Sequence, residues 1–156
     1  MKLTEFISKK AILPTVKATD KKGVIQELVQ AARKAYDNER FVVADVVDVV
    51  VQREKVGSTG IGGGVGVPHA KLDGIKNVIG AFGRCTPGID FNAVDGEPVG
   101  LVFLILSPPS KGEAYLKALQ KVMTALKRPN FVKFLKSAKT VRDIEEIFRE
   151  VEEVAV

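Results

Sequence analysis

His69 is the only histidine of the chain, and it ends a glycine-rich segment that begins after Arg53. A neutral imidazole is a good nucleophile toward phosphorus at physiological pH, and it can also leave again readily. The glycines let the backbone approach a ligand closely and expose N–H groups to an anion. Arg53 adds a guanidinium suited to phosphate oxygens, and Ser58 and Thr59 add hydroxyl donors. We therefore predict that His69 carries a phosphoryl group, although a histidine with a structural role and a simple glycine-rich turn are alternatives on residue types alone.

Other chemistries fit this segment less well. A dinucleotide-binding fingerprint needs glycines at its first, third and sixth positions, and the sixth position counted from Gly60 is Val65. A P-loop needs a lysine after its last glycine, and a valine follows Gly66. His69 and Cys85 alone make no metal-ligand cluster, so we expect neither a metal nor a cofactor. A hydrolase that uses His69 is a third hypothesis, but the chain has no nucleophile elbow to support it.

The elements that must position His69 are expected to be helices and strands in alternation. Apolar residues at helical spacing predict helices over residues 20–35, 41–52, 109–126 and 140–151, with a shorter helix after Pro129. The valines of residues 41–52 favour a strand by propensity, but their period is helical. Strands are predicted over 77–83 and 98–106, and residues 56–66 are predicted to be a loop. This order favours one α/β domain over residues 1–156, a three-layer sandwich with a mixed sheet and helices on both faces.

Composition limits the function classes. The formal charge is +5, from 24 Lys+Arg and 19 Asp+Glu, but the basic residues are dispersed and only 6% of residues are aromatic, so we expect no nucleic-acid partner. The N-terminus does not resemble a signal peptide, and the longest apolar run is too short to span a bilayer. The single cysteine cannot form an internal disulfide. We therefore expect a cytoplasmic protein without membrane insertion.

The segment resembles the signature of the IIA components of the bacterial phosphoenolpyruvate-dependent phosphotransferase system, of the fructose, mannitol and nitrogen-regulatory type. The likeness covers nearly the whole chain. It rests on the helix around Leu116 and on the stretches Arg53-Glu54, Gly57-Ser58-Thr59-Gly60-Ile61-Gly62, Gly64-Val65, Val67-Pro68-His69, Gly88-Ile89-Asp90-Phe91, Asp95-Gly96 and Val102-Phe103-Leu104-Ile105. A chain of this length is most similar to the nitrogen-regulatory branch.

The resemblance implies that His69 accepts phosphate through Nε2 from a phosphohistidine on an HPr-type phosphocarrier protein. It also implies that Arg53 steadies the phosphate and that Ser58 and Thr59 shape the loop around it. Such a protein is a phosphoryl carrier rather than a stand-alone turnover enzyme. Nitrogen-regulatory members switch their binding to targets such as a potassium transporter or a sensor kinase, whereas sugar-transporting members pass the group to a IIB domain.

One position departs from the family pattern. Family members usually carry a second histidine where this chain has Tyr115. A tyrosine hydroxyl can support the phosphate through a hydrogen bond, but it supplies no positive charge near neutral pH. The departure favours a regulatory role over sugar transport. It also keeps open the alternative of a phosphorylation-incompetent binding module with the same fold.

Overall fold

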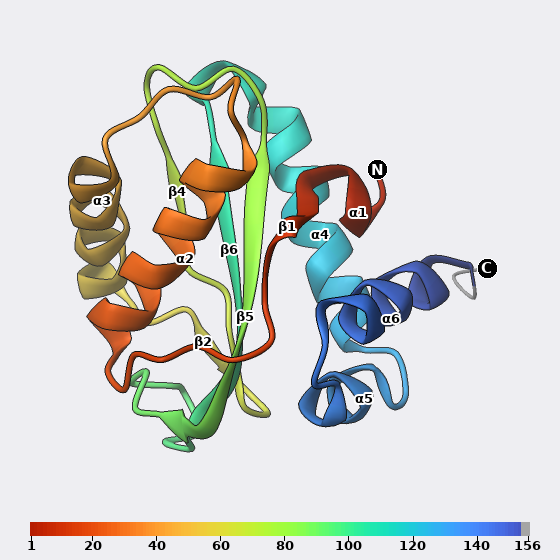
Figure 1. Ribbon diagram of the computed structural model, residues 1–156. Helices are drawn as coiled ribbons and strands as arrows, with labels where there is room; N and C mark the ends of the chain where they lie inside the picture. The colour runs from red at the N-terminus through yellow and green to blue at the C-terminus, as the bar shows by residue number, and fades with distance from the viewer. Residues whose placement is uncertain (154–156) are drawn as a thin grey trace.

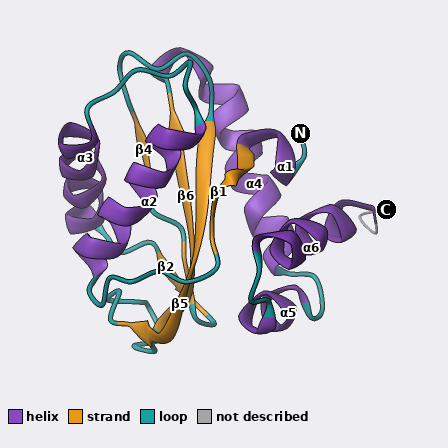
Figure 2. Cartoon of the chain, in the orientation of Figure 1, coloured by secondary structure: helices purple, strands orange, loops and turns teal. Residues whose placement is uncertain are grey.

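A mixed β-sheet lies at the centre of the computed structural model, which describes residues 1–153 (Figures 1 and 2). The strands are β1 (Ile7–Leu13), β2 (Gly60–Gly62), β3 (Val65–Gly66), β4 (His69–Lys71), β5 (Ile79–Ile89) and β6 (Val99–Ser107). Their order is β1-β5-β6-β3-β2, and β4 also pairs with β6. β5 and β6 are antiparallel, whereas β1 is parallel to β5, and β3 and β4 are parallel to β6. The predicted mixed sheet is confirmed.

Helices cover both faces of this sheet, as predicted. The helices are α1 (Leu3–Phe6), α2 (Lys21–Ala35), α3 (Val43–Val56), α4 (Gly112–Leu126), α5 (Phe131–Ser137) and α6 (Val141–Glu153), and the 3-10 helix η1 (Pro109–Lys111) precedes α4. α2 and α3 cover one face, and α1, α4, α5 and α6 lie on the other (Figure 1). Each face has its own apolar core, so the sheet separates two hydrophobic layers.

The central strand β6 shows why this arrangement follows from the sequence. Its residues are almost all apolar, which is typical of a strand buried on both faces. Because side chains alternate along a strand, Val102 and Leu104 enter the core beneath α2 and α3, whereas Phe103 enters the core beneath α4. Burial of all three side chains in the two cores fixes the register of β6 with its neighbours.

Two helices confirm the predictions made from local patterns. Asp20 caps α2, and its side chain accepts a hydrogen bond of 2.9 Å from the backbone N–H of Gly23. α3 is helical despite its valines, because Val46 and Val50 are buried on one face while Asp48 stays exposed. At this position the helical period is a better guide than β propensity.

Several elements differ from the predictions. β1 was not predicted, because a register shift between Ile7 and Ile12 interrupts the alternation of apolar and polar residues. The predicted loop over residues 56–66 contains the short strands β2 and β3, which end the sheet. β5 ends at Ile89, whereas the predicted strand ends at residue 83. The helical spacing of apolar residues over 109–126 predicts that Leu116 is buried, but it is 59% exposed.

No helix within residues 1–153 combines the length and the apolar character needed to cross a membrane.

Candidate functional site

His69 is the first residue of β4, and the central strand of the sheet fixes its backbone. His69 pairs with Ile105 in the parallel ladder between β4 and β6. The backbone N–H of Ile105 also donates a hydrogen bond of 3.0 Å to the carbonyl of Pro68. Val67 and Pro68 are buried, whereas the His69 side chain is half-buried. The histidine backbone is therefore held by the central strand of the sheet, while its ring remains partly accessible.

A backbone contact fixes the tautomer of the His69 ring. Nδ1 lies 2.7 Å from the carbonyl oxygen of Val67. A carbonyl oxygen can only accept a hydrogen bond, so in the neutral ring Nδ1 carries the proton and Nε2 keeps the lone pair. The same contact restrains rotation of the ring. Nε2 is thus the nitrogen available as a nucleophile.

A buried carboxylate holds the glycine-rich loop next to the histidine. Glu54, near the end of α3, accepts a hydrogen bond of 2.9 Å from the backbone N–H of Thr59, and the Thr59 hydroxyl also donates to this carboxylate. The Lys21 ammonium lies 3.4 Å from the same carboxylate. The Thr59 carbonyl in turn accepts a 3.0 Å bond from the N–H of Val67, whose own carbonyl contacts His69. Polar contacts therefore connect Glu54 to the histidine through Thr59 and Val67.

Ser58 and Arg53, two other residues predicted for the site, also contact the loop backbone. The Ser58 hydroxyl donates a 2.6 Å bond to the carbonyl of Phe91 and accepts one of 3.0 Å from the N–H of Gly60. The Arg53 guanidinium donates a 2.8 Å bond to the carbonyl of Gly57. The hydroxyls of Ser58 and Thr59 thus hold the loop backbone in its conformation, which fits the loop-shaping part of their predicted role.

Two glycines of this segment are constrained in different ways. A Cβ on Gly60 would lie 2.8 Å from the Cα of Ala93, which is too close for any side chain. Gly63 has φ of +67°, in the left-handed region that favours glycine. Its surroundings are open, so the constraint there is conformational rather than steric. Gly60 therefore allows close packing of the loop against Ala93, and Gly63 allows a left-handed turn of its backbone.

Tyr115 faces the histidine from the first turn of α4. The ring centroids of His69 and Tyr115 are 5.9 Å apart, and the planes are tilted by 54°. Burial raises the pKa of the Tyr115 hydroxyl above its ordinary value, and the positive charge of Arg53 partly offsets this rise. The hydroxyl is consequently neutral at physiological pH. The structure brings His69 and Tyr115 together, whereas the Arg53 guanidinium contacts the carbonyl of Gly57.

Sequence reasoning missed two residues of this neighbourhood. Glu54 lies within the stretches that resemble the family signature, but nothing in the local sequence indicates that this acidic side chain is buried against Thr59. Lys71 follows His69 by two residues on β4, and its ammonium lies 5.7 Å from the ring centroid of Tyr115. The alternation of side chains along a strand was the signal that could have found Lys71, but β4 itself was not predicted.

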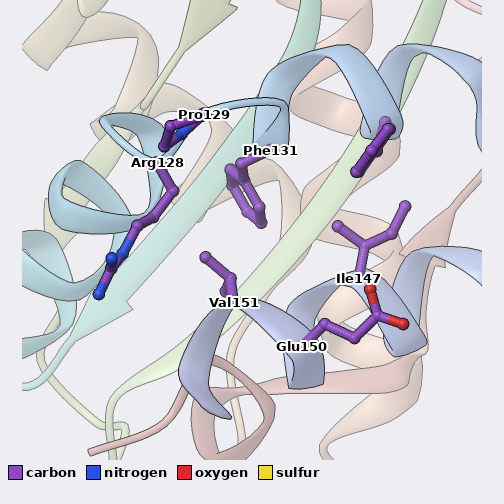
Figure 3. A pocket seen from close by; sticks show the side chains of 7 residues that line it. Arg128, Pro129, Phe131, Ile147, Glu150 and Val151 are labelled. Carbon is purple, nitrogen blue, oxygen red and sulfur yellow. The ribbon is translucent and has the colours of Figure 1, made fainter. Parts of the chain in front are cut away.

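Two hollows lie beside other elements. An apolar one of about 190 Å³ lies between α5 and α6 and is lined by Phe131, Ile147 and Val151, with Arg128 and Glu150 at its edge (Figure 3). None of its lining residues belongs to β4, the glycine-rich loop or the first turn of α4. A polar one is bordered by Lys21, Lys22 and Lys55 and reaches Ser58 from the α2 side. Within residues 1–153, no three His, Cys, Asp or Glu side chains gather closely enough to hold a metal ion.

Comparison with known protein families shows which class of protein has this fold. Residues 5–151 match the family described as "Phosphoenolpyruvate-dependent sugar phosphotransferase system, EIIA 2". The chain belongs to this family of phosphotransferase-system IIA components. Membership supports a role as a phosphocarrier or regulatory protein.

Within the family, the chain is similar to nitrogen regulatory proteins. It is 39% identical over 145 residues to the nitrogen regulatory protein of Bradyrhizobium diazoefficiens, with 92% of each chain covered. It is 36% identical to the fructose-specific EIIABC component of Bacillus subtilis, where the match covers 90% of this chain and 22% of that protein. The crystal structure of IIA-Ntr from Neisseria meningitidis superposes with a TM-score of 0.85 at 28% identity and covers 94% of this chain and 98% of that one.

Proposed function

We propose that this chain accepts a phosphoryl group on Nε2 of His69 from an HPr-type phosphocarrier protein and acts as a nitrogen-regulatory phosphoprotein. The observation that carries the proposal is the 2.7 Å contact between Nδ1 of His69 and the carbonyl of Val67. It directs the lone pair to Nε2 before any donor arrives. A nucleophile with a fixed orientation loses little freedom when the donor docks.

The proposed step is a displacement at phosphorus. The Nε2 lone pair attacks the phosphorus of the donor phosphohistidine, and the N–P bond to the donor breaks. The electron pair of that bond returns to the donor nitrogen, so the donor leaves as a neutral imidazole when its other nitrogen is protonated. Nδ1 of His69 keeps its proton, which stays hydrogen-bonded to the Val67 carbonyl. The new phosphohistidine has the same charge as the donor phosphohistidine had. The reaction is therefore close to balanced and reversible, as a carrier requires.

The surrounding residues have defined roles in this proposal. Arg53 has the role of holding the phosphoryl oxygens, because a guanidinium can donate paired hydrogen bonds to them; its guanidinium would exchange the carbonyl of Gly57 for these oxygens. Ser58 and Thr59 keep the loop backbone in place through their hydroxyl contacts. Tyr115 supports the phosphate with a neutral hydroxyl.

The regulatory assignment rests on similarity and on one residue. Nitrogen regulatory proteins match this chain over most of their length. Tyr115 provides no second imidazole for onward transfer to a sugar pathway. We infer that the phosphorylation state controls binding to a protein target, with a potassium transporter or a sensor kinase as candidate classes.

The test is phosphoryl transfer followed by intact mass. The protein is incubated with phosphoenolpyruvate, the first enzyme of the system and an HPr-type carrier, beside a His69→Ala variant. We expect one acid-labile phosphate on the parent protein and none on the variant. An unmodified parent, with carriers that phosphorylate another acceptor, would favour the alternative of a binding module that does not take phosphate.

A further inference from the structure

Lys71 shares a strand face with His69. The residue between them, Ala70, is buried in the core beneath α2 and α3. Because side chains alternate along a strand, His69 and Lys71 project together toward the opposite face. That face is covered by α4, and Tyr115 belongs to its core. The two side chains therefore approach the same aromatic ring from one short strand.

The Tyr115 ring is contacted by both the lysine and the histidine. The Lys71 ammonium lies 5.7 Å from the ring centroid, within the range of a cation–π contact, and the His69 ring centroid lies 5.9 Å from the same point. Within residues 1–153, Lys71 makes no ion pair with a carboxylate. Its side chain is exposed, and a lysine ammonium sits on a long flexible stem. A positive charge without a carboxylate partner thus shares the Tyr115 ring and the strand face with His69.

The charges around His69 indicate what this lysine does. A phosphoryl group carries about two negative charges near neutral pH. The Arg53 guanidinium balances one of them, and the Tyr115 hydroxyl supplies none. We propose that Lys71 is a phosphate-binding residue, whose ammonium moves from the face of Tyr115 to the phosphoryl oxygens on His69 and completes the charge balance with Arg53. This inference rests on the proposed function. Lys71 stays protonated throughout, so it stabilises the transferred group without taking part in bond making.

The experiment compares three variants with two phosphoryl donors. Lys71→Met removes the charge and keeps an apolar stem of similar length, whereas Lys71→Arg keeps the charge. Lys76→Met is the matched control, because Lys76 is an exposed lysine on the connection that follows β4. One donor is the phosphorylated HPr-type carrier. The other is phosphoramidate, a small phosphoryl donor that has no docking surface. Initial rates of phosphorylation and the lifetime of the phosphoprotein are measured by intact mass.

We expect Lys71→Met to be phosphorylated more slowly by about tenfold or more with both donors, the typical effect of losing one charge-assisted contact. Lys71→Arg should recover most of the rate, and Lys76→Met should match the parent. Parent rates for Lys71→Met with both donors would overturn the inference alone. A loss confined to the carrier would also overturn it, because Lys71 would then recognise the carrier protein rather than the phosphoryl group. A parent protein that takes phosphate from neither donor would overturn the proposed function itself.

Discussion

The two sides of His69 are built differently. On the loop side, a buried carboxylate, two hydroxyls and a chain of backbone hydrogen bonds hold residues 54–67 in place. On the α4 side, the Tyr115 ring faces the histidine, the Lys71 ammonium lies over that ring, and Leu116 is exposed. The loop side is part of the folded framework, whereas the α4 side offers groups that can contact a phosphoryl group on His69.

This difference separates stability from function around one residue. Changes on the loop side leave buried polar groups without partners, so they lower the free energy of unfolding. On the α4 side, Lys71 and Leu116 are exposed, so the fold tolerates changes at these two residues, although Tyr115 itself is buried. A phosphoryl carrier benefits from this division, because the nucleophile stays fixed while the side that receives the charge can adjust.

The largest effect is expected for Glu54→Ala. The variant leaves the N–H and hydroxyl of Thr59 and the ammonium of Lys21 without their acceptor, at a cost of about 2–5 kcal/mol in the free energy of unfolding. Urea denaturation measures it. Glu113→Ala is the control, because Glu113 pairs with Lys117 on the exposed face of α4. Such a pair contributes at most about 1 kcal/mol. Equal losses in the two variants would refute the framework role of Glu54.

A smaller effect separates two glycines of the same loop. Gly60→Ala forces the backbone around Ala93 to move, and overpacking of this kind costs about 1–3 kcal/mol. Gly63→Ala meets open space and pays only for a left-handed backbone, about 1 kcal/mol. Thermal melting should therefore give a lower melting temperature for Gly60→Ala than for Gly63→Ala. The reverse order would mean that conformation, rather than close packing, limits this loop.

On the α4 side, the neutral state of Tyr115 has a consequence at alkaline pH. Burial raises the pKa of Tyr115 in the folded state above its value in the unfolded chain. The stability that this group contributes is fully present below about pH 10 and is lost as the pH rises through the folded-state value. We expect Tyr115→Phe to lose stability less steeply than the parent in alkaline urea melts. A remaining decline in Tyr115→Phe is expected from Tyr36, whose pKa burial also raises. An equal slope in both proteins would contradict the burial of the Tyr115 hydroxyl.

The smallest effect is expected for Leu116→Ser. Leu116 is 59% exposed, and substitutions at such positions change stability by less than about 0.5 kcal/mol. Val122→Ala, in the buried face of the same helix, should cost about 1.5 kcal/mol or more. Urea melts of both variants measure the contrast. A comparable loss in Leu116→Ser would mean that this side of α4 also belongs to the framework.

Sequence patterns predicted the layers of the fold better than its edges. β6, α2 and α3 have a strong period or a continuous apolar run, and each was predicted correctly. β1, β3 and β4 are short or irregular, so their burial comes from pairing with β5 and β6 rather than from their own sequence. Such strands are specified by tertiary context, which a local pattern does not contain.

The candidate site divides in the same way. His69, Arg53, Ser58 and Thr59 were singled out because their types and spacing suggest phosphate chemistry. The buried contact of Glu54 with Thr59 depends on where α3 ends relative to the loop. The approach of Lys71 to Tyr115 depends on β4 lying across from α4. Both are contacts between elements, and the sequence alone does not determine them.

The central claim is that Val67 directs the reactivity of His69 to Nε2, and one nitrogen-15 NMR measurement tests it directly. Because the chain has a single histidine, labelling with ¹⁵N-histidine gives the signals of one ring. In the neutral free protein we expect a protonated Nδ1 and an unprotonated Nε2, and after phosphoryl transfer we expect coupling of phosphorus to Nε2. A neutral ring protonated at Nε2, or phosphorus coupled to Nδ1, would contradict the account.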